Sequence, residues 1–279
     1  MRKIVLLVVF TLSVATTSGQ EISPLATAVD GPVPPTVVPG ARIGDPPSDA
    51  IVLFDGVSLD EWESLGGGAA KWLVENGIVT VIPGSPNIRT KRSFGDIQLH
   101  VEWRAPTTVV HGKSLKADDT NYVEQVAAFL GLSQDYVDAE IARYGQSQYM
   151  ANSGIFLQEL YEIQVLETYG IHTYVNGQAG AVYKQHVPLV AATREPGEWQ
   201  TYDIIYRAPR FGTTESVVVP ATLTLLINGI LVHNNVEIQG PTQFIGISPY
   251  KSHGPSAIVL QSHLGVSQIS YRNIWVREL

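Results

Sequence analysis

Apolar and polar residues alternate over short stretches through most of the chain. In the most informative stretch, Tyr161, Ile163 and Val165 fall on one face of an extended strand. Glu162 and Gln164 fall on the opposite face, which places a carboxyl group beside an amide. A strand with one apolar and one polar face is typical of a sandwich layer. We therefore predict that this polar face forms the floor of a cleft.

Turn signals separate the alternating stretches. Asn76-Gly77 and Asn228-Gly229 are each flanked by apolar strands, and this dipeptide favours a two-residue β-hairpin. Many short strands with such turns predict an all-β fold, a jelly-roll sandwich of two antiparallel sheets. The longest predicted strands cover residues 97–105, 199–208, 221–227, 230–238 and 269–277.

The pattern changes between residues 107 and 148. Asp119–Leu130 and Ser133–Tyr144 have helical spacing of apolar residues, with Asp119 and Ser133 as N-caps. We predict a two-helix insertion that lies as a lid or flank over one end of the sandwich.

The N-terminal region has a different composition from the rest. Residues 1–19 combine Arg2 and Lys3 with a short apolar run and small residues, the anatomy of a signal peptide. Residues 20–50 are rich in Pro, Val, Ala and Gly and predict an extended linker before a domain covering residues 51–279. We therefore expect a secreted protein, periplasmic or extracellular, whose mature form has no transmembrane segment.

Overall composition narrows the possible chemistry. The chain of 279 residues has a net charge of −8, which gives no electrostatic footprint for nucleic acid. It contains no cysteine, so disulfides, thiolate metal sites and a cysteine nucleophile are excluded. Neutral ligands such as sugars remain compatible with this charge.

Six short motifs occur in one order along the chain. They are L-F-D-G-x-S-L-x-x-W from Leu53, N-S-G-I-F-L-Q from Asn152, Y-E-I-Q-V-L-E from Tyr161, G-E-W-Q-T-Y-D-I-I-Y-R-A-P from Gly197, N-G-I-L-V-H-N-N-V-E-I-Q-G-P-T from Asn228 and Y-R-N-I-W-V-R from Tyr271. Together they resemble the bacterial 3-keto-disaccharide hydrolase domain, a concanavalin A-like jelly roll. The insertion at 107–148 departs from that family pattern, in which only a short connection is expected.

The resemblance implies a secreted carbohydrate-active enzyme that cleaves the glycosidic bond of 3-keto-glycosides. A ketone at C3 acidifies the proton on C2, so a base can remove it and the resulting enolate can expel the C1 oxygen. Water can add afterwards, or the bond can be hydrolysed directly. Such an enzyme needs a base near C2, stabilisation of the ketone oxygen and a proton donor for the leaving oxygen.

Strand parity selects the candidate residues for these roles. Glu162, His263 and Glu102 are the predicted catalytic groups, converging on one concave sheet face. The same three residues are predicted to hold a divalent metal ion, if one is used, through oxygen and nitrogen ligands. The predicted substrate-binding residues are Gln164, Gln261, Tyr183, Lys184 and Arg104.

Two other functions compete with this one. The stretch E-I-Q-V-L-E resembles the signature of laminarinase-like enzymes, so a retaining β-glycosidase could use Glu162 and Glu167. There Gln164 replaces the aspartate expected between the two glutamates. Glu167 also falls on the wrong face unless a bulge re-aims it. A non-catalytic carbohydrate-binding module is the second alternative, and it would need exposed aromatic residues on the concave face.

Overall fold

A computed structural model describes residues 33–82, 84–107, 133–144, 151–170, 173–263 and 268–279. The chain divides into two compact units, residues 1–36 and residues 37–279. All the elements named below belong to the second unit. The predicted signal peptide lies outside the described residues. Among the residues that are described, no helix is both long and apolar enough to cross a membrane.

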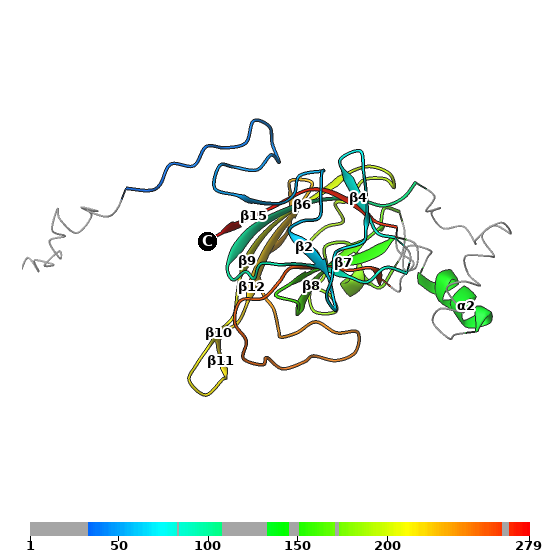
Figure 1. The fold of residues 1–279 in the computed structure, drawn as a ribbon. Coiled ribbons are helices and arrows are strands. Elements are labelled where there is room, and N and C mark those ends of the chain that lie inside the picture. The colour runs from blue at the N-terminus through cyan, green and yellow to red at the C-terminus, as the bar shows by residue number, and fades with distance from the viewer. Residues whose placement is uncertain (1–32, 83, 108–132, 145–150, 171–172, 264–267) are drawn as a thin grey trace, which may run out of the picture. The chain divides into compact units, whose positions relative to one another are not determined.

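Eight antiparallel strands form the larger sheet, and its central strands lie side by side in Figure 1. Their order is β13–β12–β9–β6–β15–β4–β3, and β1 also pairs with β15. In chain order these strands are β1 (Ile51–Phe54), β3 (Leu73–Glu75), β4 (Ile78–Thr80), β6 (Ile97–Arg104), β9 (Gln200–Arg207), β12 (Thr222–Ile227), β13 (Ile230–Glu237) and β15 (Ser270–Glu278).

Five antiparallel strands form the second sheet, in the order β2–β5–β14–β7–β8. They are β2 (Trp62–Ser64), β5 (Ile88–Thr90), β7 (Asn152–Leu157), β8 (Tyr161–Leu166) and β14 (Val259–Leu260). A small hairpin pairs β10 (Arg210–Phe211) with β11 (Val217–Val219), and Val175–Gly177 forms one 3-10 turn, η3. The two main sheets confirm the predicted antiparallel sandwich.

The hydrophobic core contains alternate residues of both sheets. Leu99, Val101 and Trp103 of β6 are fully buried in it, as are Ile155 of β7 and Ile163 of β8. Residues between these positions therefore point away from the core, to the outer face of their own sheet. The alternation of core-facing and outward-facing residues along each strand therefore decides which polar side chains share an outer face.

Both predicted Asn-Gly hairpins are confirmed. Asn76 and Gly77 have φ values of 52° and 78° between β3 and β4, and Asn228 and Gly229 have 53° and 79° between β12 and β13. Two consecutive positive φ angles are what a type I′ turn requires, and Asn and Gly tolerate them best.

The insertion is described only in part. α2 covers Gln134–Tyr144, as predicted, and the Oγ of Ser133 accepts a hydrogen bond from the Tyr136 amide at 3.3 Å. This is the expected N-cap interaction. The other predicted helix, Asp119–Leu130, lies outside the described residues, so the pair of helices stays a prediction.

The folded unit begins earlier than the predicted boundary at residue 51. Residues 37–50, which we call the strap, bind the outer face of β15. The carbonyl of Gly44 accepts hydrogen bonds from Asn273 Nδ2 at 2.9 Å and Trp275 Nε1 at 2.8 Å. Arg277 forms an ion pair with Asp49 at 2.6 Å. The second half of the predicted linker is therefore part of the domain.

Candidate functional site

Glu162 and Gln164 lie on the outer face of the five-stranded sheet, as parity predicts. The register between β7 and β8 is regular, with Phe156 opposite Glu162 and Gly154 opposite Gln164. Both polar side chains are nevertheless buried, at 6% and 1% exposure. All six residues of β8 are buried, so this face is covered and is not an open, solvated surface.

Gly154 makes room for the carboxyl group of Glu162. A Cβ atom at this glycine would lie 2.5 Å from Glu162 Oε1 and 2.9 Å from the ring of Phe156. A glycine inside a strand often marks such a close approach. The Glu162 carboxyl group is therefore seated over the backbone of β7.

Burial without a partner changes the acidity of Glu162. In the part of the chain that the structure describes, its carboxyl group forms no hydrogen bond or ion pair. Removal from water disfavours the charged form, and this desolvation raises the pKa of Glu162 to about 8. At neutral pH the group is mostly protonated, so it can donate a proton.

An isolated bridge pairs Val182 with Ile163 of β8, and Tyr183 and Lys184 lie in the turn that follows. The Tyr183 amide donates to the Glu162 carbonyl at 3.0 Å, which places Tyr183 directly beside Glu162. The hydroxyl groups of Tyr183 and Tyr174 are 3.1 Å apart, and Lys184 Nζ lies 3.5 Å from the Tyr174 ring centroid. Burial raises the pKa of Tyr183, so its hydroxyl stays neutral.

Gln261 follows β14 directly and joins the same outer face. Its backbone amide donates to the carbonyl of Gly154 at 3.0 Å, while its Oε1 is buried and has no hydrogen-bond partner among the described residues. Gln164 Nε2 in turn donates to Asn152 Oδ1 at 2.7 Å. The structure thus brings Glu162, Gln164, Gln261 and Tyr183 together, as predicted.

His263 lies three residues beyond the end of β14, not within it. Its side chain keeps partial exposure, but desolvation by its surroundings lowers its pKa to about 4. The imidazole is therefore neutral at pH 7 and can accept a proton. Within the described residues it has no hydrogen bond or ion pair with Glu162, so its place at the site stays a prediction.

The prediction that Glu102 and Arg104 join this site is wrong. Both belong to β6 in the eight-stranded sheet, where Val101 and Trp103 face the core. Glu102 therefore points to the outer face of the other sheet, and the sandwich separates it from Glu162. Parity alone could not reveal this, because it shows which residues share a strand face but not which sheet the strand joins.

The predicted metal site of Glu102, Glu162 and His263 does not fit this structure, since the two carboxyl groups lie on different sheets. Glu102 instead binds Arg272 at 2.6 Å and Asn273 at 2.9 Å. Among the described residues, no group of three or more His, Asp or Glu side chains is arranged to hold a metal ion.

A charged network under the strap explains the position of Glu102. His100 Nδ1 lies 2.7 Å from Asp203, and its Nε2 lies 3.7 Å from Glu102, too far for a hydrogen bond. The imidazole also stacks on Trp275 and packs beneath Gly44. Burial opposes protonation of His100, but the two carboxylates prevail and raise its pKa to about 9. This buried imidazolium supports the strap.

The alternative pairing of Glu162 with Glu167 also fails. The unbroken register of β8 contains no bulge, so Glu167 has the parity of Val165 and faces the core. Its Oε1 accepts from the Tyr169 amide at 2.7 Å, and its Oε2 is buried with no partner in the described part of the chain. Burial raises its pKa to about 7. A retaining pair needs both carboxyl groups on the same side, about 5–5.5 Å apart.

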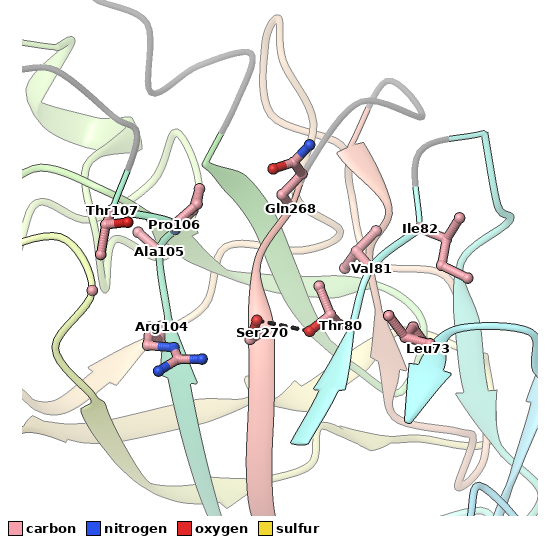
Figure 2. Close-up of a pocket in the computed structure, with 11 residues that line it drawn as sticks. Leu73, Thr80, Val81, Ile82, Arg104, Ala105, Pro106, Thr107, Gln268 and Ser270 are labelled. Carbon is pink, nitrogen blue, oxygen red and sulfur yellow. Dashed lines mark hydrogen bonds between the residues drawn. The ribbon is translucent and has the colours of Figure 1, made fainter. Parts of the chain in front are cut away.

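The described residues also line a pocket of about 720 Å³ at one end of the eight-stranded sheet, shown in Figure 2. Arg104 lies on its wall, and Thr80 and Ser270 are hydrogen-bonded across its floor at 2.9 Å. None of the described residues that line it carries a carboxyl group or an imidazole. Because it offers no general acid or base, we locate the candidate site on the other sheet, around Glu162.

The two antiparallel sheets form a sandwich of the jelly-roll class, with a buried acid, amides and a tyrosine on one outer face. Residues 49–277 match the profile of the 3-keto-alpha-glucoside-1,2-lyase-like domain. The chain belongs to this family, which confirms the resemblance found in the sequence motifs.

Solved structures support the same assignment. A candidate glycosyl hydrolase from Parabacteroides distasonis is 42% identical, with a TM-score of 0.77, over 94% of this chain and 99% of its own. A second one from that organism, 16% identical with a TM-score of 0.54 over 83% of this chain and 94% of its own, shows the shared fold. No protein of curated function matches the chain.

Sequence analysis missed two features of the site. Gly154, inside the N-S-G-I-F-L motif, could have been found from the rule that an isolated strand glycine indicates a close approach. Tyr174 gave no comparable signal, because it lies outside the strands and reaches Lys184 only through the fold.

Proposed function

We propose that this protein cleaves the glycosidic bond of 3-keto-glycosides at the outer face of the five-stranded sheet. The observation that carries the proposal is Glu162, a buried carboxyl group that is protonated at neutral pH and has no partner among the described residues. Family membership supports a glycoside substrate. A group that is costly to bury and unpaired is a candidate for chemistry.

The chemistry begins at C2 of the sugar. A base takes the C2 proton, and the electron pair of that bond forms an enolate with the ketone at C3. The enolate then reforms the ketone as the C1–O bond breaks and its electron pair passes to the leaving oxygen. The products are a sugar with a C1–C2 double bond and an alcohol, and water can add to that double bond afterwards.

Glu162 suits the role of acid, because its proton can pass to the leaving oxygen. His263 suits the role of base, because its lowered pKa keeps it neutral at pH 7. Gln164, Gln261 and Tyr183 supply amide and hydroxyl groups that can hydrogen-bond the sugar. The buried Oε1 of Gln261, which has no partner among the residues that the structure describes, can accept a hydrogen bond from a sugar hydroxyl.

Glu162→Gln and Glu167→Gln form a matched pair of variants, since both carboxyl groups are buried in or next to β8 but lie on opposite faces. Methyl glucoside and its 3-keto derivative are incubated with each protein in D2O. Deuterium at C2 and the ultraviolet absorbance of the unsaturated ketone report the reaction.

We expect cleavage of the 3-keto compound only. Glu162→Gln and His263→Ala should each lower turnover about 10²- to 10⁴-fold, while Glu167→Gln stays near wild type.

Near-full activity of Glu162→Gln would refute the acid role. Equal losses in both glutamine variants with cleavage of ordinary glycosides would favour the retaining glycosidase. Binding of the sugar without turnover would favour a carbohydrate-binding module. A parallel reaction with a metal chelator tests whether the predicted divalent cation is needed.

Export is proposed on the N-terminal pattern of residues 1–19. Mass spectrometry of protein from the periplasm or medium should find a chain shortened by about 15–20 residues, as signal-peptide anatomy predicts. A chain that starts at Met1 would contradict it.

A further inference from the structure

Lys184 lies in an aromatic cluster next to Glu162. Its Nζ is 3.5 Å from the ring centroid of Tyr174, 4.8 Å from that of Phe244 and 5.8 Å from that of Tyr183. The backbone amide of Tyr183 donates a hydrogen bond to the carbonyl of Glu162. The cation is therefore held over the segment that borders the proposed acid.

An unusual backbone conformation directs Lys184 to this position. Val182 faces the core, so strict alternation would send Tyr183 outward and the next side chain inward. Lys184 instead has φ of 63°, in the left-handed region that non-glycine residues rarely adopt. Its amide is fixed to the Asn176 carbonyl at 2.7 Å. The strained turn keeps the ammonium group on the same side as Tyr183.

No carboxylate in the described part of the chain neutralises this cation. Among the described residues, Lys184 forms no salt bridge, and Glu162 is protonated at neutral pH. Desolvation lowers the pKa of Lys184, as expected for an ammonium group held against aromatic rings. Phe244 presents an apolar ring beside it that is 64% exposed. A cation without a carboxylate partner in the described part of the chain, next to an open aromatic face, suits an aromatic ligand on which negative charge develops.

We propose that Tyr174, Lys184 and Phe244 form an aglycone subsite beside Glu162 and that this subsite takes a phenolic aglycone. The proposal rests on the proposed function, because the aglycone lies beyond the leaving oxygen that Glu162 protonates. The aromatic ring of the aglycone stacks on Phe244, and Lys184 stabilises negative charge as the phenol oxygen departs.

Phe244→Ala tests the stacking, with Ile245→Ala as its control, because Ile245 is the next residue and is 78% exposed. The ratio of kcat/KM for phenyl 3-keto-glucoside to that for the methyl compound is measured for each full-length protein. We expect this ratio to fall about three- to tenfold in Phe244→Ala, the range typical of an aromatic pair, and to stay unchanged in Ile245→Ala.

Lys184→Met tests the charge, with Lys184→Arg as the variant that retains it. Across substituted phenyl 3-keto-glucosides, log kcat should depend more steeply on the pKa of the leaving phenol in Lys184→Met, and Lys184→Arg should restore the slope. An unchanged slope, or an unchanged phenyl-to-methyl ratio in Phe244→Ala, would overturn the proposal. A larger effect of Phe244→Ala on a 3-keto-disaccharide would assign the subsite to a second sugar and overturn it too.

The subsite remains testable if the protein turns over no 3-keto-glycoside. Binding of phenyl and methyl glucoside is then compared by titration calorimetry. Weaker phenyl glucoside binding in Phe244→Ala, but not in Ile245→Ala, would support the subsite while the proposed function fails. Equal binding of the two glucosides by the wild type would reject the subsite.

Discussion

Replacing Glu162 by glutamine should stabilise the protein while it removes activity. The substitution keeps the size and shape of the side chain, so the space over Gly154 stays filled. It removes a group whose charged form is disfavoured by burial. A residue that costs stability yet is needed for turnover is expected at an active site.

The magnitude follows from the pKa of Glu162, which burial raises from 4.5 to about 8. Between these values the unfolded chain has released its proton and the folded chain has not. The folded state therefore binds more protons, and stability falls as pH rises through this window. From pH 4.5 to pH 7 the cost is 2.5 pH units at about 1.36 kcal/mol each, or roughly 3 kcal/mol. At 6% exposure, solvent screening reduces this little.

Urea unfolding at pH 4.5, 6, 7 and 8 measures the effect. Glu162→Gln should match the wild type near pH 4.5 and exceed its unfolding free energy by roughly 3 kcal/mol at pH 7. Glu198→Gln is the control, because this glutamate is exposed, and its difference from the wild type should stay near zero. If Glu162→Gln gains nothing at pH 7, or gains the same amount at every pH, the carboxyl group is not desolvated and the reasoning fails.

Three further predictions follow from the same structure. The pH profile of kcat/KM should be bell-shaped, falling below about pH 4 as His263 gains a proton and above about pH 8 as Glu162 loses one. An alkaline limb that persists unchanged in Glu162→Gln would belong to another group. Gly154→Ala should displace the Glu162 carboxyl group and lower kcat about 10²-fold with little change in the circular dichroism spectrum, and full activity would show that the carboxyl position is not critical. The pKa of His100 is raised from 6.5 to about 9. The imidazolium therefore contributes fully to the free energy of unfolding below pH 6.5, and this contribution is lost as pH rises to 9. Over that range the wild type should lose up to about 3 kcal/mol more unfolding free energy than His100→Gln, less where solvent screens the half-exposed Asp203, because both proteins share the loss that comes from Glu162. Equal losses in both proteins would argue against a buried imidazolium.

Local chemistry specified much of the fold. The Asn-Gly dipeptides set two type I′ turns because their residues tolerate positive φ, and alternation in β6 and β8 set which side chains face the core. The helix after Ser133 followed from its cap. The place of Glu162 and Gln164 on one face also followed, because period-two geometry holds within any strand and the register of β7 and β8 has no bulge.

Tertiary structure decided which strand faces meet. Glu102 and Glu162 have equivalent local patterns, yet β6 and β8 belong to different sheets, so one carboxylate supports the strap and the other is left unpaired. The raised pKa of Glu162 arises from burial of a face that alternation alone would leave in water. The contact of Phe244 with Lys184 likewise joins residues 60 positions apart. Sheet order and burial depend on long-range packing, and short-range sequence patterns carry no information about that packing.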